Sequence, residues 1–349
     1  MDPGEILIRV TCCTICGSDL HTYSGRRSAP ANCVLGHEII GLVEAWHGES
    51  QPLDFHGNPL TMGQRVTWAM AVGCDECFYC RNGLPQKCET LFKYGHAVGT
   101  DGKPTGGLST YCVLVPGTAV FPIPDDLSDQ EACPANCAGA TVSAAMRLVR
   151  QTHRLDEATI LIVGAGMLGL TAAAQASDAG ASRIVVVDPD PTRIELARQF
   201  GATDTVVATK NSGGESLLSQ LSLDRGFDIA LEFSGSNAGV ENAIASIRTG
   251  GCVLLAGSVF PSGDIEVSPE SIVRQMITLR GLHNYAPKDL ADALLFLQRT
   301  RNQFPFESLV GPRFELSRVS DAFLHATTQH SIRVSVCPDS ERGTIAIDR

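Results

Sequence analysis

The middle of the chain alternates between short apolar runs and stretches with helical spacing. Four runs rich in β-branched residues predict strands that are buried on both faces: residues 159–163, 184–188, 227–232 and 252–256. Buried strands that alternate with helices of about 10 to 15 residues are typical of a parallel, doubly wound sheet. The pattern therefore predicts an α/β domain in this part of the chain.

The flanking segments have a different pattern. Residues 4–115 contain shorter strand-like runs, such as 5–10 and 63–68, separated by turn residues. Regular spacing of this kind predicts an all-β module. Two amphipathic helices and a last strand are predicted after Pro287: residues 289–298, 318–328 and 332–336.

Length, composition and net charge limit the classes of protein to which the chain can belong. The 349 residues are 44% hydrophobic and 19% charged and include no low-complexity tract, which indicates a folded chain, and the length predicts two domains. The net charge of −11 argues against nucleic acid or an anionic membrane as the main partner, because both need a basic footprint. No apolar run reaches the length of a membrane span, and the first residues lack the features of a signal peptide. We therefore expect a cytoplasmic protein.

A glycine-rich turn follows the first buried strand. Gly164, Gly166 and Gly169 form a G-x-G-x-x-G motif between this strand and an alanine-rich helical pattern. In a Rossmann domain the first glycine permits the tight turn, the second lets a pyrophosphate approach, and the third lets the helix pack on the sheet. The phosphate lies at the helix N-terminus, where unpaired N–H groups favour an anion. A lone glycine turn is common, but its place between strand and helix predicts a dinucleotide site.

An acidic residue ends the next strand. Asp188 lies about 20 residues after Gly169, where a carboxylate accepts hydrogen bonds from the ribose and repels a 2′-phosphate. The sequence thus favours NAD over NADP, although Arg193 is near enough to accommodate that phosphate. The alternative for Asp188 is a turn aspartate before Pro189. The expected cofactor-binding residues are Gly164, Gly166, Met167, Leu168, Gly169, Asp188, Arg193, Ser234, Gly257 and Ser258.

Four of the thirteen cysteines stand close together. Cys74, Cys77, Cys80 and Cys88 form a C-x2-C-x2-C-x7-C array. Four thiolates this close in sequence can complete a tetrahedral zinc shell and leave no position for water, which predicts a structural zinc site. Similar spacing can hold an iron–sulfur cluster, but nothing else in the sequence indicates electron transfer.

Other potential metal ligands are spread along the chain. Cys16, His37 with Glu38, and Cys137 are zinc-binding residue types, yet each alone is more often a buried cysteine or a hydrogen-bonded histidine. Spacing alone does not join them. Seven cysteines have no assigned role: Cys12, Cys13, Cys33, Cys112, Cys133, Cys252 and Cys337.

The order of these motifs resembles a known family. Cys16, the Gly-His-Glu triplet at 36–38, the four-cysteine array and the later G-x-G-x-x-G resemble, over almost the whole chain, the zinc-dependent medium-chain alcohol dehydrogenases. Four segments are most similar to the branch labelled phosphonate-associated alcohol dehydrogenases: residues 83–88, 91–96, 231–235 and 282–285. The branch label says little about the substrate.

The resemblance implies a catalytic zinc. Its ligands would be Cys16, His37 and Cys137, with one position open for a substrate oxygen and Glu38 as an alternative ligand. Asp19 would hold the imidazole of His37 and fix its tautomer.

The resemblance also implies a proton relay. Ser18 matches the hydroxyl that hydrogen-bonds the substrate oxygen, and His21 matches the group that passes the proton onward through the cofactor ribose. A histidine can exchange that proton with solvent near neutral pH.

The leading hypothesis is a zinc enzyme that transfers hydride between NAD(H), or alternatively NADP(H), and a small alcohol or carbonyl substrate. Residues 1–143 and 286–349 are expected to form a β-rich, GroES-like catalytic domain with the structural zinc lobe at 74–88. Residues 144–285 are expected to form the Rossmann domain. The resemblance implies two zinc ions per chain and a homodimer or homotetramer.

Two other functions stay open. One is a reductase or reductive cyclase that acts on a conjugated double bond in a polyketide-type pathway, in which zinc is structural or absent. The other is a dinucleotide-binding or thiol-sensing protein, which would not need Ser18 and His21 beside an open zinc. His96, His283 and Tyr285 stay open between lining the substrate or nicotinamide cleft and a loop role.

Overall fold

The structure is a computed structural model that describes residues 1–209, 213–329 and 331–338. The chain divides into two compact units. The first unit is residues 1–137 with the C-terminal part from Phe306, and the second is residues 138–305. These limits differ from the predicted 143/144 and 285/286. The reason is that α4 (Ala138–Val149) and α10 (Pro287–Thr300) are continuous helices that pack on each other within the second unit.

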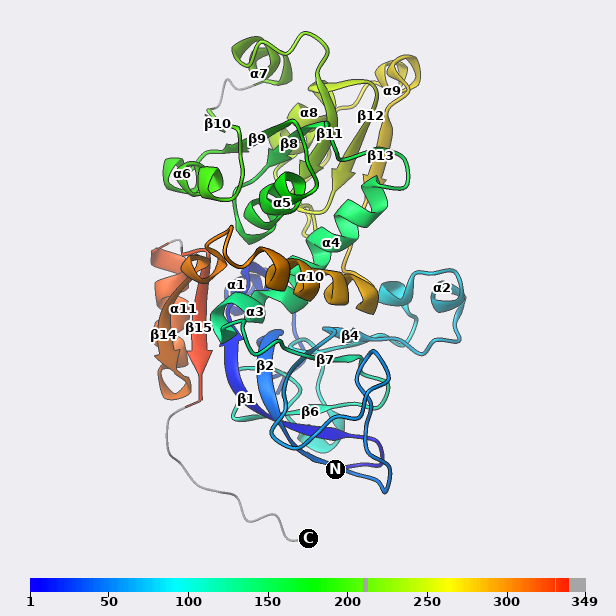
Figure 1. Cartoon of the computed structure of the whole chain (residues 1–349), viewed down its shortest axis with the longest axis vertical. Coiled ribbons are helices and arrows are strands. Elements are labelled where there is room, and N and C mark those ends of the chain that lie inside the picture. Colours follow the sequence, from blue (N-terminus) through cyan, green and yellow to red (C-terminus); the bar gives the residue numbers. More distant parts are fainter. Residues whose placement is uncertain (210–212, 330, 339–349) are drawn as a thin grey trace. The chain divides into compact units, whose positions relative to one another are not determined.

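A seven-stranded mixed sheet forms the first unit (Figure 1). Its strands run in the order β14-β15-β1-β2-β3-β7, and β6 also pairs with β1. Their bounds are β1 (Ile6–Thr14), β2 (Glu38–Trp46), β3 (Arg65–Trp68), β6 (Tyr111–Leu114), β7 (Val120–Pro122), β14 (Val310–Glu315) and β15 (Arg333–Cys337). β15 lies antiparallel to β1, with Cys13 opposite Val336, so the C-terminal strand shares a sheet with the first strand.

Residues 4–115 are β-rich, as expected, but they are not all-β, because short helices interrupt the sheet. α1 (Gly17–Tyr23) begins after Cys16, whose backbone N–H donates to the Asp19 carboxylate at 2.9 Å and so caps the first turn. The other elements of this unit are the hairpin β4 (Ala71–Val72) and β5 (Phe92–Lys93), helices α2 (Phe78–Arg81), α3 (Asp129–Ala132) and α11 (Val319–Thr328), and 3-10 helices η1 (Pro85–Lys87), η2 (Thr100–Gly102), η3 (Cys133–Asn136), η4 (Phe306–Leu309) and η5 (Leu316–Arg318).

Two apolar clusters hold this unit together. One lies on the sheet and includes Ile8, Ile39 and Trp68, together with the unassigned Cys13 and Cys112. The other packs α11 against β15 and against Ile15, which follows β1. In the first cluster, Cys13 and Cys112 therefore behave as small buried hydrophobic residues.

A parallel six-stranded sheet forms the second unit, as the apolar runs predicted. Its order is β10-β9-β8-β11-β12-β13. The strands are β8 (Thr159–Val163), β9 (Arg183–Asp188), β10 (Asp204–Val207), β11 (Phe227–Glu232), β12 (Ile247–Leu255) and β13 (Thr278–Gly281). The remaining helices are α5 (Met167–Asp178), α6 (Pro191–Gln199), α7 (Gly214–Gln220), α8 (Asn237–Ala245) and α9 (Pro269–Gln275).

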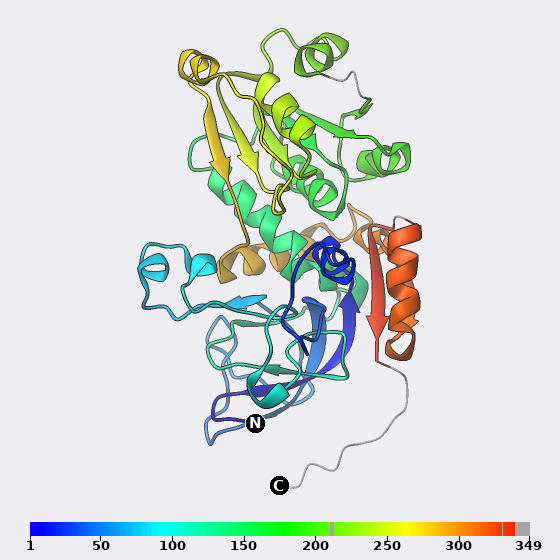
Figure 2. The same ribbon diagram turned by 180° about the vertical axis from the view of Figure 1, so that it is seen from behind.

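Helices cover both faces of this sheet. α5 lies in front of it in Figure 1, and α8 comes to the front in the reversed view of Figure 2. The strand order reverses direction between β8 and β11, which places the topological switch point at the carboxyl ends of these two strands. Ligands of open α/β sheets bind at such a point.

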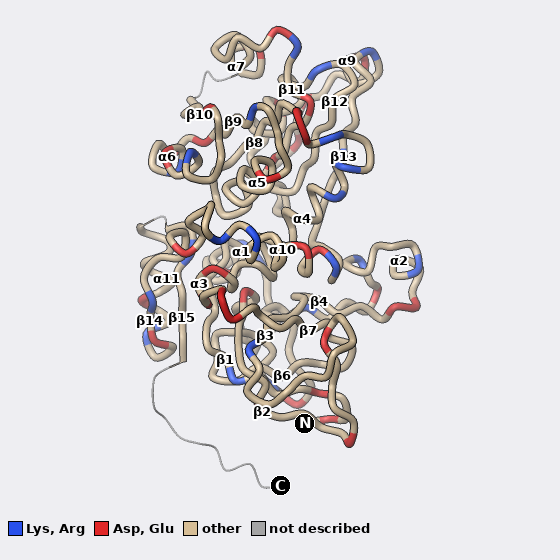
Figure 3. Tube along the Cα trace, in the orientation of Figure 1, with Lys and Arg blue, Asp and Glu red and all other residues tan. Residues whose placement is uncertain are grey.

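Charged side chains are mixed in sign along the described part of the chain, and Figure 3 shows no continuous basic segment there. Of the helices that the structure describes, none combines the length and hydropathy needed to cross a membrane.

Candidate metal and cofactor sites

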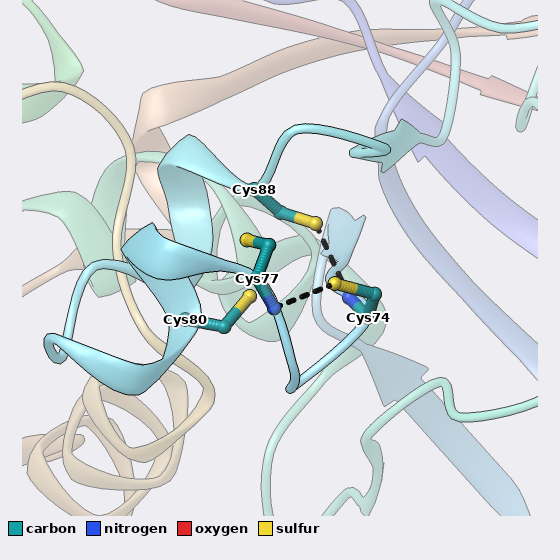
Figure 4. A group of neighbouring side chains, drawn as sticks. All are labelled: Cys74, Cys77, Cys80 and Cys88. Atoms are coloured by element: carbon teal, nitrogen blue, oxygen red, sulfur yellow. Dashed lines mark hydrogen bonds between the residues drawn. The ribbon is translucent and has the colours of Figure 1, made fainter.

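The four-cysteine array forms one cluster of sulfurs. Figure 4 shows Cys74, Cys77, Cys80 and Cys88 pointing toward one another around α2 and η1. Their Sγ atoms all lie within 4.8 Å of one another. Tetrahedral zinc with Zn–S bonds of about 2.3 Å requires sulfurs about 3.8 Å apart, so only small shifts separate this cluster from a closed shell.

Backbone N–H groups surround these sulfurs. Cys74 N donates to Cys88 Sγ at 3.2 Å, and Cys77 N donates to Cys74 Sγ at 3.3 Å. A hydrogen bond from the backbone of Cys80 lowers the pKa of Cys77. Donors aimed at sulfur favour the thiolate, which is the form that binds metal. The cluster therefore fits a structural zinc ion.

A second cluster joins three ligands that are far apart in sequence. Cys16 caps α1, His37 immediately precedes β2, and Cys137 follows η3. Their potential ligand atoms also lie within 4.8 Å of one another, and the two sulfurs are 4.0 Å apart. Three protein ligands leave a tetrahedral metal with one open position, as in catalytic zinc sites.

Asp19 fixes the orientation of His37. Both side chains are fully buried, and His37 Nδ1 lies 3.2 Å from Asp19 Oδ1. A carboxylate can only accept, so Nδ1 carries the proton and Nε2 is left as the nitrogen for a metal. This agrees with the role that the resemblance implied for Asp19.

The turn that contains Gly95 packs closely against Gly36 and His37. Gly95 has φ +71°, and a Cβ there would lie 2.6 Å from the carbonyl oxygen of Gly36 and 3.1 Å from His37 Cβ. Only glycine permits this approach. As a result, Lys93 and His96 lie on a turn that packs directly on the metal-ligand segment.

The predicted relay residues lie on α1. Ser18 Oγ is 3.3 Å from His37 Nε2, so its hydroxyl stands beside the nitrogen that faces the metal position. His21 lies three residues later, on the same side of the helix. Partial burial, followed by the charge of Arg26, lowers the pKa of His21, so the ring is neutral at pH 7.

Glu38 lies outside the set of converging ligand atoms, and its role as an alternative ligand stays a prediction. Arg333 donates to both of its carboxylate oxygens at 2.8 Å, and Thr14 Oγ1 donates to Oε2 at 2.5 Å. The carboxylate is therefore held by the guanidinium. Burial raises the pKa of Glu38 to about 7, and the charge of Arg333 opposes that rise.

Arg333 also reaches the metal cluster, and sequence reasoning missed it. Its Nη2 donates to Cys16 Sγ at 3.6 Å. The hydrogen bond with Cys137, and then the charge of Arg333, keep the pKa of Cys16 well below its usual value, which favours the thiolate. The sequence did contain one signal for this contact: Arg333 is the only charged residue in the apolar last strand, and a buried charge requires a partner.

His96 stands next to His37, with ring centroids 4.9 Å apart. Arg27 Nη1 lies 3.3 Å from His96 Nε2. A guanidinium only donates, so this ring nitrogen accepts. Burial, which has the largest effect, and the positive charges around the ring lower the pKa of His96 to about 2, which keeps the ring neutral.

The glycine motif of the second unit has the geometry that a dinucleotide requires. Gly164 turns with φ +99°, and a Cβ at Gly169 would lie 1.7 Å from the carbonyl oxygen of Gly164. A Cβ at Gly166 would meet nothing within 4 Å, so the space beside this backbone is open. Gly166 precedes α5, where Met167 is buried and Leu168 half-buried.

Asp188 is tied to this turn at the end of β9. Its Oδ2 accepts from Ala165 N at 2.7 Å, and its Oδ1 accepts from Asp190 N at 2.9 Å. Arg193 makes an ion pair of 3.7 Å with Asp190. The position of Asp188 suits a ribose-binding carboxylate, and Arg193 interacts with a neighbouring acid.

The remaining cofactor candidates lie after β11 and β12. Ser234 Oγ donates to the buried Glu232 at 2.6 Å, and a Cβ at Gly257 would lie 2.4 Å from Gly235 N. These loops therefore pack closely, and Ser258 is exposed beside them. Gly164 and Ser234 share a cavity of ≈ 330 Å³, also lined by Val187, Ser236 and Asn242, at the switch point of the sheet.

Comparison with known proteins supports the same assignment. Residues 2–125 match the alcohol dehydrogenase GroES-like domain, and residues 168–299 match the zinc-binding dehydrogenase domain. An L-threonine 3-dehydrogenase of Deinococcus deserti is 31% identical over 285 residues, which cover 80% of this chain and 77% of the relative. A 5-exo-hydroxycamphor dehydrogenase of Pseudomonas putida is 28% identical over 92% of this chain and 88% of the relative. An alcohol dehydrogenase structure from Thermotoga maritima has a TM-score of 0.90 at 25% identity, covering 97% of this chain and 93% of that one.

These matches define an oxidoreductase built from a GroES-like and a Rossmann-like domain. The chain belongs to the zinc-dependent medium-chain alcohol dehydrogenase family. It is a zinc enzyme that transfers hydride between a nicotinamide cofactor and an alcohol or carbonyl compound. The similarity to the phosphonate-associated branch stays a prediction.

Proposed function

We propose that Cys16, His37 and Cys137 hold the catalytic zinc and that Cys74, Cys77, Cys80 and Cys88 hold a second, structural zinc. The observation that carries this proposal is the convergence of Cys16, His37 and Cys137, with His37 Nδ1 bonded to a buried carboxylate. When bound, zinc supplies a Lewis acid that favours loss of a proton from an alcohol or polarises a carbonyl.

Residues of α1 move the proton. The Ser18 hydroxyl stands beside His37 Nε2 and can donate to, or accept from, a substrate oxygen at the open metal position. His21, neutral at pH 7, takes the proton onward to solvent. Asp19 keeps His37 in one tautomer throughout and is a positioning residue.

The second unit binds the cofactor, and we propose NAD(H) over NADP(H). The carboxylate of Asp188 is held beside the glycine turn, where it would accept from the ribose hydroxyls and repel a 2′-phosphate. The pyrophosphate would bind at the glycine turn, formed by Gly164, Gly166, Met167, Leu168 and Gly169. The ribose and nicotinamide of the cofactor would be lined by Ser234, Gly257 and Ser258. We further propose a cytoplasmic homodimer or homotetramer, on the family resemblance.

Metal analysis combined with two cysteine substitutions tests the proposal. Wild-type protein should contain two zinc ions per chain, and Cys16→Ala and Cys77→Ala should each contain one. Cys16→Ala should lose NAD(H)-dependent turnover of alcohols while it keeps a wild-type melting temperature. One zinc in the wild type, or turnover that survives Cys16→Ala, would instead favour a reductase of conjugated double bonds.

A further inference from the structure

Cationic side chains gather beside the catalytic metal ligands of the first unit. Arg27 follows α1, and its backbone N–H donates to the His21 carbonyl at 3.1 Å, which folds this loop back on the helix. Lys93 and His96 come from the turn that Gly95 packs against Gly36 and His37. Two separate segments therefore deliver cations to the same side of the metal centre.

Arg27 is held in place by a neutral partner. Its Nη1 donates to His96 Nε2 at 3.3 Å, and the His96 ring lies tilted against that of His37, with centroids 4.9 Å apart. Among the residues that the structure describes, no carboxylate makes an ion pair with Arg27. The guanidinium is half-buried and retains its positive charge and its other donors for a further group.

Lys93 adds a second positive charge in the same region. Burial lowers its pKa most, the nearby Cys137 raises it, and the charge of Arg27 lowers it further. Zinc would neutralise the thiolates of Cys16 and Cys137, and the Asp19 carboxylate is bonded to His37. Arg27 and Lys93 therefore place two cationic side chains near the metal ligands of a chain whose net charge is −11.

We propose that Arg27, supported by Lys93, binds an anionic group of the substrate, so that the enzyme acts on alcohols or carbonyl compounds that carry a carboxylate, phosphonate or phosphate. This rests on the proposed function of the metal site. Guanidinium suits these anions because its planar donors match two of their oxygens, and an ammonium adds a point charge. A neutral substrate would leave the Arg27 guanidinium without an ion-pair partner among the described residues.

Matched substrate pairs test the proposal on the zinc-loaded enzyme with NAD(H) at constant ionic strength. Each pair compares an anion with its neutral counterpart: 3-hydroxybutyrate with its methyl ester, 2-hydroxypropylphosphonate with its dimethyl ester, and glycerol 3-phosphate with glycerol. At least one anion should exceed its counterpart in kcat/KM by about 10-fold or more. The ranking of the three anions identifies which anionic group is recognised.

Substitutions assign the preference to residues. Arg27→Gln and Lys93→Gln should raise KM for the preferred anion by about 10-fold and change its neutral counterpart little, and Arg27→Lys should keep part of the preference. The control is Arg318→Gln, which removes an exposed cation that pairs with Asp321 in the same unit and should change neither substrate. Equal kcat/KM within every pair, or a preference that Arg27→Gln leaves intact, overturns the proposal.

Failure of the reaction itself has a different signature. If neutral members are turned over as well as anionic ones, the oxidoreductase assignment holds and the anion site is refuted. If no compound changes nicotinamide absorbance, binding of acetate, methylphosphonate and inorganic phosphate is measured by calorimetry. Saturable binding that Arg27→Gln abolishes then supports the anion site, and absence of binding refutes it.

Discussion

Arg333→Met should destabilise the first unit strongly, because it removes the partner of a buried carboxylate. Glu38 is 0% and Arg333 6% exposed, and two 2.8 Å hydrogen bonds join them. Breaking a buried ion pair by removing one partner costs about 3–5 kcal/mol. With an m value of about 2 kcal/mol/M, the urea midpoint should fall by about 1.5–2.5 M.

Tryptophan fluorescence makes this measurement specific to one unit. The only two tryptophans in the sequence, Trp46 and Trp68, both lie in the first unit, so the signal reports its unfolding separately from that of the Rossmann unit. Arg9→Met is the matched control: its pair with Glu44 is 45% and 34% exposed and should be worth at most about 1 kcal/mol.

A double substitution separates the lost pair from the unpaired charge. Glu38→Met combined with Arg333→Met removes both charges, and it should recover much of the stability that Arg333→Met alone loses. If Arg333→Met shifts the midpoint no more than the Arg9→Met control, the argument from an uncompensated buried carboxylate is refuted.

Three further predictions concern the cofactor site and the relay. Gly169→Ala should prevent normal folding of the Rossmann unit, because its Cβ would collide with the Gly164 carbonyl oxygen. Gly166→Ala should keep the stability of this unit within about 0.5 kcal/mol but weaken NADH binding in a fluorescence titration. Equal stability of the two variants would contradict this argument. Asp188→Asn should raise the Kd for NADH and lower that for NADPH, and an unchanged ratio of the two would argue against a ribose-binding role. His21→Gln should lower kcat about 100-fold at pH 7 with unchanged zinc content, while wild-type kcat would speak against the relay.

Local features of the sequence predicted most of the fold. The strands β8, β9, β11 and the C-terminal part of β12 lie where the apolar runs placed them, because strands covered on both faces need continuous apolar side chains. The glycine motif and the four-cysteine lobe were equally readable, since all their groups come from one turn or one short loop. Helix α1 could not be predicted in this way, because its start depends on one carboxylate, that of Asp19, which accepts from the backbone N–H of the N-cap residue Cys16.

The metal centre depends on contacts that no local pattern encodes. Cys16 and Cys137 are 121 residues apart, and Glu38 and Arg333 are 295 residues apart. The pairing of β1 with β2 and β15 brings Glu38 and Arg333 together, and that pairing is a property of the whole sheet. From the sequence, Arg333 in an apolar strand indicates only that a buried acid must exist somewhere. The register that sets Cys13 opposite Val336 selects Glu38 as that acid, and the same pairing directs the guanidinium toward Cys16. The buried ion pair between Arg333 and Glu38 therefore couples the C-terminal strand to the surroundings of Cys16.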